Sequence, residues 1–176
     1  MTTKCARDIM IPLNKYPHIP YWFTLRQAVA ELEKTSLEIN GLKSLPRALL
    51  VFDEKYLLLG IVRRRDILRG LEPNFLRHLS VSEKHSSMDI KIDPNLIEMS
   101  SCFDSLSKAI KKQADVVVSE VMQPIVATVN ADDHLAKIIY IMIEQDLNLI
   151  SVLENEKVVG VVCSVGVFHQ IANVLL

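Results

Sequence analysis

The sequence has no run of apolar residues long enough to cross a membrane. Its richest stretch, residues 135–143, is interrupted by Lys137 and falls well short of the roughly 18 residues that a transmembrane helix requires. Cys5, Cys102 and Cys163 are odd in number and widely spaced, so they fit neither a disulfide framework nor a zinc site. The N-terminus also lacks the apolar segment of a secretion signal. Together these absences predict a cytoplasmic protein that is not held in a membrane.

The sequence patterns of common catalytic and metal sites are missing as well. Only five glycines occur in 176 residues, and none of them forms a glycine-rich phosphate loop. The five histidines show no metal-binding spacing. Cys163 follows a predicted strand, but it has no neighbouring base that would activate a nucleophile. We therefore expect no enzymatic activity, no catalytic residue, no metal ion and no required cofactor.

Charge is balanced over the whole chain but unevenly distributed along it. The net charge is −1, so no global field attracts nucleic acid, and we do not expect it as a partner. Residues 1–72 carry 12 Lys and Arg against 8 Asp and Glu, whereas residues 118–176 carry 2 against 7. An anionic ligand would therefore be attracted to the first region. The hydrophobic share of 49% exceeds the needs of a small core, which predicts a homodimer.

The main feature that the sequence does contain is a pattern that occurs twice. Residues 10–12 (Met-Ile-Pro) recur as residues 122–124 (Met-Gln-Pro), and residues 52–62, which include Gly60, recur as residues 153–162, which include Gly160. A unit of about 60 residues would bury too little surface to be stable alone. The two copies should therefore pack together, with a cleft between them that suits a binding module.

The residue pattern of each copy predicts an extended strand, a helix, a β-hairpin and a closing helix, in that order. Thr24 and Gln27 form a capping box that predicts a helix from residue 25 to about residue 36, with Gly41 as the stop signal. In the first copy the remaining predicted elements are strands at 48–52 and 56–62 and a helix at 63–71. In the second copy they are a strand at 127–129, a helix at 132–145, strands at 149–153 and 158–162 and a helix at 165–174. Most of the extra length of the first copy lies around residues 38–45, which we interpret as a surface-loop insertion.

In this order the residues resemble a tandem pair of CBS (cystathionine β-synthase) domains. The most specific segment is the turn at residues 60–67, Gly-Ile-Val-Arg-Arg-Arg-Asp-Ile. The resemblance implies an α/β (α+β) fold with two pseudo-symmetric β-α-β-β-α units packed sheet to sheet, at residues 1–72 and 118–176. Residues 73–117 would form a helical connector, with a helix start at Asp93-Pro94, a helix up to about Gln113 and a mobile loop near residues 80–90.

The resemblance also implies a function and a site. The chain would be a regulatory module that binds AMP, ADP, ATP or a related adenosyl compound in the cleft of the first unit and signals in trans to an effector protein by an allosteric shift. Asp66 would accept hydrogen bonds from the ribose hydroxyls, although a helix-start carboxylate favoured by the helix dipole explains it equally well from position alone. Arg63 and Arg65 would hold phosphate, unless the arginines are simply solvated. The adenine would lie near four residues: Ile19, Pro20, Ala48 and Leu49.

The sequence departs from the family pattern in both units. Arg63 stands where the family has Ser or Thr, and in the second unit Cys163 and Gly166 replace the hydroxyl residue and the Asp. The second cleft would be lined by Cys163, Ser164 and Val126, and it would be vacant or divergent. These losses, with the apolar surplus, leave a ligand-free dimerisation or interaction scaffold as the alternative function.

Overall fold

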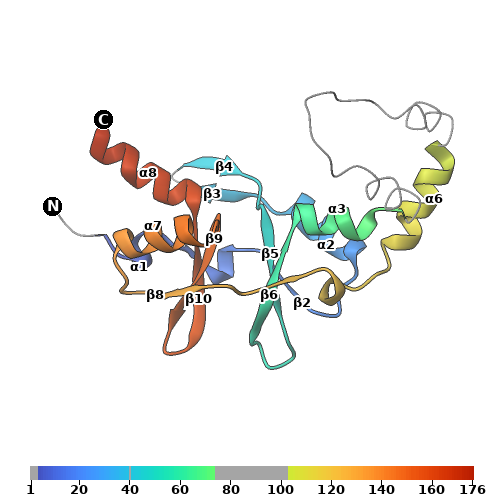
Figure 1. The fold of residues 1–176 in the computed structure, drawn as a ribbon, viewed down its shortest axis with the longest axis horizontal. Helices are drawn as coiled ribbons and strands as arrows, with labels where there is room; N and C mark the ends of the chain where they lie inside the picture. Colours follow the sequence, from blue (N-terminus) through green and yellow to red (C-terminus); the bar gives the residue numbers. More distant parts are fainter. Residues whose placement is uncertain (1–3, 40, 74–102) are drawn as a thin grey trace, which may run out of the picture.

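The computed structural model describes residues 4–39, 41–73 and 103–176, which form two four-stranded sheets with helices on their outer faces (Figure 1). The sheet of the first unit has the strand order β2 (His18–Pro20), β5 (Ala48–Phe52), β6 (Leu58–Arg63), β7 (Gln123–Pro124). The sheet of the second unit has the order β1 (Ile11–Pro12), β10 (Lys157–Cys163), β9 (Leu149–Glu154), β8 (Thr128–Asn130). In both sheets the two central strands form an antiparallel hairpin, and the two hairpins point the same way in Figure 1.

The helices follow the predicted order. They are α1 (Ala6–Ile9), α2 (Leu25–Lys34), α3 (Arg64–Leu71), α6 (Phe103–Gln113), α7 (Leu135–Glu144) and α8 (Ser164–Leu175), with single 3-10 turns at Leu13–Lys15 and Val118–Glu120. The capping box of α2 forms as predicted, because Gln27 N donates to Thr24 Oγ1 at 3.3 Å and Thr24 N donates to Gln27 Oε1 at 2.9 Å. The predicted helix start at residues 93–94 and the loop near residues 80–90 lie outside the described residues.

The two units exchange their edge strands. Strand β1, which belongs to the first repeat in sequence, pairs with β10 through Ile11 and Val161, and β7 of the second repeat pairs with β6 through Gln123 and Ile61. The close approach of the exchanged strand explains why each repeat has a glycine at the corresponding position, Gly60 in the first and Gly160 in the second. A Cβ atom at Gly160 would lie 2.6 Å from the backbone oxygen of Ile11, and one at Gly60 would lie 2.5 Å from that of Gln123. The sequence boundaries at residues 72 and 118 stay a prediction, since each sheet draws one edge from the other repeat.

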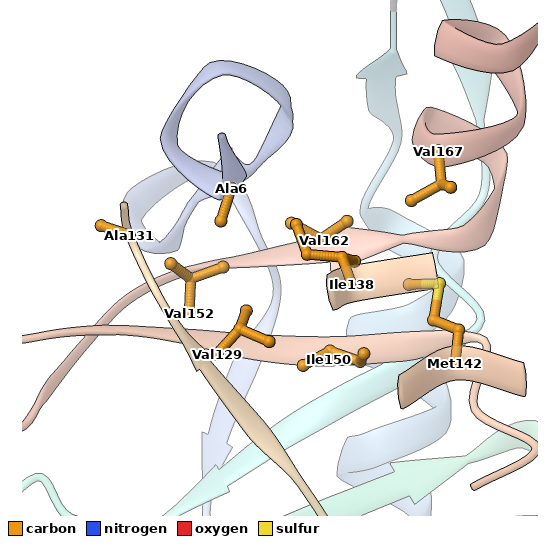
Figure 2. Packing of buried hydrophobic residues seen from close by; sticks show 9 residues of the cluster. All are labelled: Ala6, Val129, Ala131, Ile138, Met142, Ile150, Val152, Val162 and Val167. Atoms are coloured by element: carbon orange, nitrogen blue, oxygen red, sulfur yellow. The ribbon is translucent and has the colours of Figure 1, made fainter. Parts of the chain in front are cut away.

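The cores explain why β5 is apolar along its whole length. On β5, Leu49 and Val51 pack with Ile67 of α3, whereas Leu50 and Phe52 point the other way and pack with Val161 of the second sheet. Figure 2 shows the matching cluster of the second unit, where side chains from the sheet meet Ile138 and Met142 of α7 and Val167 of α8. The predicted fold class, with two units packed sheet to sheet, is confirmed.

The insertion in the first copy differs from the prediction. It is not a surface loop but a β-hairpin of β3 (Leu37–Ile39) and β4 (Leu42–Ser44), and Leu37 is buried between the units. Helix α2 ends at Lys34, and Gly41 lies in the hairpin turn with φ +79 instead of ending the helix. The physical reason is pairing: the extended backbone of the two short strands satisfies its own hydrogen bonds and brings one wall to the space between the units.

Candidate functional site

A cavity of about 410 Å³ lies between the two units, and we call it the central cavity. Its apolar wall comes from both units and from the inserted hairpin, through Leu37, Ala48, Ile61 and Leu149. Its volume is in the range of small-molecule sites. Tyr16 is buried at its base, where its hydroxyl donates to the backbone oxygen of Ala48 at 2.9 Å. The cavity therefore lies where the central hairpins of both sheets begin, and the inserted hairpin borders it through Leu37 and Ser44.

Four arginines border the central cavity: Arg47, Arg63, Arg64 and Arg65. They gather there because Arg47 precedes β5 and the other three lie where β6 turns into α3. The N–H of Arg64 donates to the backbone oxygen of Arg47 at 3.3 Å, which ties the two segments together. All four are exposed, and Asp146 of the second unit is the acidic residue of the lining. The cationic wall and the start of α3 both favour an anion at this place.

Arg63 also forms an ion pair with Asp66, which is 1% exposed. Its Nε donates to Oδ2 at 2.9 Å, its terminal nitrogen donates to Oδ1 at 3.1 Å, and its backbone N–H donates to Oδ2 at 3.0 Å. Gln123 of β7 adds a longer contact of 3.4 Å to Oδ1. Burial by itself raises the pKa of Asp66, but the hydrogen bonds and the charge of Arg63 outweigh it and hold the pKa below its usual value. Asp66 is therefore an ionised carboxylate whose acceptors are largely occupied by Arg63.

A second hollow, of about 310 Å³, adjoins the central cavity, and we call it the side cleft. It lies between the segment that leads from β7 to β8, including Ile125 and Ala127, and the start of β9 at Leu149. Arg63 borders both hollows. The lining also includes Ser151, which is 2% exposed; its Oγ is the buried side-chain polar atom without a hydrogen-bond partner in the described part of the chain. An unsatisfied buried hydroxyl at a cleft offers a donor and acceptor to whatever enters it.

The predicted site residues divide into two groups in the structure. Arg63, Arg65 and Ala48 come together at the central cavity, and Cys163 and Ser164, which were predicted for a separate second cleft, line the same cavity. Burial raises the pKa of the Cys163 thiol to about 11, although the charge of Arg47 acts in the opposite direction. The thiol is therefore protonated near neutral pH and behaves as a small apolar wall residue.

The other predicted residues lie elsewhere. Ile19 and Leu49 are buried in the core beneath α2 and α3, and Pro20 pairs with Phe52 at the edge of the sheet opposite to β7. Val126 is 61% exposed and borders the side cleft next to Arg63. The exchange of edge strands explains this rearrangement, because it brings residues 123–127 of the second repeat, rather than residues 19–20 of the first, to the side of Asp66. Whether each residue contacts a ligand stays a prediction.

Sequence reasoning missed Arg47, Ser151 and, apart from Val126, residues 123–127. The one available signal was Ser151, a lone hydroxyl within the apolar strand at residues 149–153. The hollow beside Asp66 and Gln123, of about 320 Å³, has a pseudo-symmetric counterpart of about 690 Å³ that is bordered by Gly166 and the segment around Ile11. Gly166 has no carboxylate to match Asp66, so the two clefts differ chemically, as the sequence indicated.

Neither a metal site nor a membrane-spanning helix is found in the part of the chain that the structure describes. Across residues 4–39, 41–73 and 103–176, His, Cys, Asp and Glu side chains nowhere gather in a group of three or more that could hold a metal ion. None of the helices described is long and apolar enough to span a membrane.

Comparisons with known proteins agree with this architecture. Residues 118–172 match the family model of the CBS domain. The CBS-pair protein CBSX2 from Arabidopsis thaliana has a similar structure, with 18% sequence identity, a TM-score of 0.63, and coverage of 99% of this chain and 98% of that chain. The CBS domain of a membrane protein from Sphaerobacter thermophilus is also similar, with 18% identity, a TM-score of 0.63, and coverage of 95% and 87%.

A third similar structure is that of CBSX2 in complex with AMP, with 17% identity, a TM-score of 0.60, and coverage of 98% of each chain. At these identities the structural likeness shows the fold. No match was found among curated proteins. The family match lies on the second unit, and the structural likeness extends over both, so the chain has the fold of a tandem CBS pair.

Proposed function

We propose that this tandem CBS module binds an adenine nucleotide at the central cavity and the side cleft and acts as a regulatory sensor. The observation that carries the proposal is the placement of four arginines around a cavity of about 410 Å³ between the units. Guanidinium groups match the oxygens of phosphate in charge and geometry. Arg65 and Arg63, which the sequence already favoured, would hold the phosphate, with Arg47 on the opposite segment.

The side cleft supplies a place for the base. Ile125, Ala127 and Leu149 offer apolar contacts on its walls, and Ser151 offers a hydroxyl that has no partner within the chain. A planar ring with polar edge atoms, such as adenine, suits this combination. The ribose would then lie between base and phosphate, next to Arg63, with Asp66 directly behind it. The complex of CBSX2 with AMP supports the choice of an adenine nucleotide, although the phosphate count is left to experiment.

The regulatory step follows from the position of the site between the units. A ligand that contacts Arg65 of the first unit and Leu149 of the second favours one relative arrangement of the two sheets and shifts the population toward it. The signal would pass in trans to an effector protein, which would bind to the surface of a homodimer of this chain. We place this module in the cytoplasm, where nucleotides are available, and propose no catalytic role for it.

Isothermal titration calorimetry with AMP, ADP and ATP tests the proposal. We expect at least one of the three to bind with a dissociation constant below 1 mM, and Arg65→Gln to weaken that binding about tenfold. Lys55→Gln is the matched control, since it removes one positive charge from the hairpin turn of the same unit, away from both hollows. Absence of heat and of thermal stabilisation with every nucleotide at millimolar concentration would refute the proposal.

An alternative, a ligand-free interaction scaffold, has one observation in its favour. Tyr140 and Ile143 of α7 and Phe168 of α8 are between 63% and 73% exposed, which is unusual for large apolar side chains on neighbouring helices. A protein that is dimeric in sedimentation experiments, and whose melting temperature no nucleotide changes, would favour the scaffold over the sensor.

A further inference from the structure

The carboxylate of Asp66 is occupied from within the chain. A carboxylate offers about four acceptor positions. Arg63 fills three of them, through its backbone N–H and two guanidinium nitrogens, at distances from 2.9 to 3.1 Å. Gln123 approaches the remaining one at 3.4 Å. Asp66 is also only 1% exposed, so a ligand hydroxyl has no free acceptor there unless one of these donors moves.

Arg63 stands between Asp66 and the proposed ligand. Its side chain is 49% exposed and borders both the central cavity and the side cleft. Asp66 borders neither of them and faces a separate hollow of about 320 Å³ beside Gln123 instead. The arrangement is a local one. Arg63 is the residue before α3 and Asp66 is the third residue of the helix, so a long side chain at position 63 folds back over the carboxylate, whereas a short one would leave it open.

We propose that Arg63 competes with ligand hydroxyl groups for Asp66 and thereby makes the site select nucleotides over nucleosides. This inference rests on the proposed nucleotide site. A nucleoside whose ribose hydroxyls donate to Asp66 must displace the side chain of Arg63, and the guanidinium group is then left without an anionic partner. A nucleotide brings a phosphate, which replaces Asp66 as the partner of Arg63 while the ribose hydroxyls donate to the vacated carboxylate. Both exchanges occur together only when one ligand carries both groups.

The test compares the affinities of AMP, adenosine and 2′,3′-dideoxyadenosine for the wild type and two variants. Arg63→Ser uncovers Asp66, and we expect it to bind adenosine about tenfold more tightly than the wild type, in line with a charge-assisted hydrogen bond. The gain should be absent with dideoxyadenosine, which lacks the 2′ and 3′ hydroxyl groups that would donate to Asp66. Lys55→Ser is the matched control, because it removes one positive charge from the same unit, lies away from both hollows and leaves the pair of Arg63 and Asp66 intact.

The outcomes separate this inference from the proposed function. If the wild type binds AMP but Arg63→Ser gains no affinity for adenosine, or gains it equally for dideoxyadenosine, Arg63 is not a competitor for Asp66. If the wild type binds no adenine nucleotide, the proposed site itself fails. Should Arg63→Ser not fold, Arg63→Lys provides the test, since a lysine keeps the charge but cannot form the two-pronged contact. It should bind adenosine a few times more tightly, and no gain would overturn the inference.

Discussion

Replacing Gly160 by alanine should destabilise the protein by about 2–4 kcal/mol. The added methyl group would lie 2.6 Å from the backbone oxygen of Ile11 and 3.0 Å from the sulfur of Met10. The sulfur can move, because it belongs to a flexible side chain. The carbonyl cannot move independently, because Ile11 belongs to β1, which pairs with β10. The clash therefore pushes the exchanged edge strand away from the sheet.

The magnitude combines two terms. Forcing one methyl group into a packed position costs about 1–3 kcal/mol. Separation of β1 from β10 also weakens the backbone hydrogen bonds around Ile11, each with a net value of about 1 kcal/mol. Gly60→Ala should behave in the same way, because its methyl group would lie 2.5 Å from the backbone oxygen of Gln123. It should in addition weaken nucleotide binding, since Gln123 leads directly into the segment that borders the side cleft.

Urea unfolding followed by circular dichroism measures the effect. Gly166→Ala is the control, because its added methyl group would lie 3.7 Å from the nearest atom, an ordinary contact, and Gly166 lies within α8. That variant should gain about 0.5–1 kcal/mol from helix propensity. A free energy of unfolding for Gly160→Ala within about 0.5 kcal/mol of the wild type, the usual range for a surface change, would refute the close approach of the two strands.

Three further predictions concern groups at the site. Asp66→Asn should lower the free energy of unfolding by about 1–3 kcal/mol at pH 7. Because folding lowers the pKa of Asp66, the stabilisation by its carboxylate is complete above the unfolded pKa of about 4 and is lost as the pH falls through the folded pKa. The stability difference between Asp66→Asn and wild type, measured from pH 7 down to pH 2, should therefore shrink below about pH 4, and a constant difference would contradict the ion pair with Arg63. Ser151→Val should leave stability unchanged or raise it by about 1 kcal/mol, since it removes an unsatisfied buried hydroxyl, yet it should weaken nucleotide binding; a clear loss of stability would show that the hydroxyl has a partner. Tyr16→Phe should cost about 1 kcal/mol in urea unfolding by leaving the backbone oxygen of Ala48 without its donor, and no change would show that water replaces the hydroxyl.

Local features of the fold could be predicted because local forces produce them. The capping box at Thr24 fixes the start of α2, and the apolar run of Ala48–Phe52 coincides with β5, since a strand buried on both faces needs apolar side chains in both directions. The inserted hairpin was missed because its two strands are only three residues long, too short for a periodic pattern to distinguish them from a loop.

The positive charge of the candidate site was predictable from the sequence, but the full set of residues that line it was not. The run of arginines at positions 63–65 and the carboxylate of Asp66 are adjacent in sequence, so their grouping needed no tertiary information. The partners of that group come from elsewhere. Arg47, Ser151 and the segment around Ile125 reach it only through the packing of the two sheets. Position also could not distinguish a free carboxylate at Asp66 from one covered by Arg63, since that depends on a side-chain conformation.

The sequence by itself determined the repeat, the order of strands and helices, the basic character of the first unit and the loss of the carboxylate at Gly166. These are properties of residue type and spacing, which act within a few positions of the chain. The tertiary structure alone decided that β1 and β7 change places, because an edge strand pairs with whichever free edge its backbone can approach, and glycine at positions 60 and 160 permits that approach. That exchange brings residues 123–127 to Arg63, and the packing of the two units places Cys163 and Ser164 of the second unit at the same central cavity as Arg63 and Arg65 of the first.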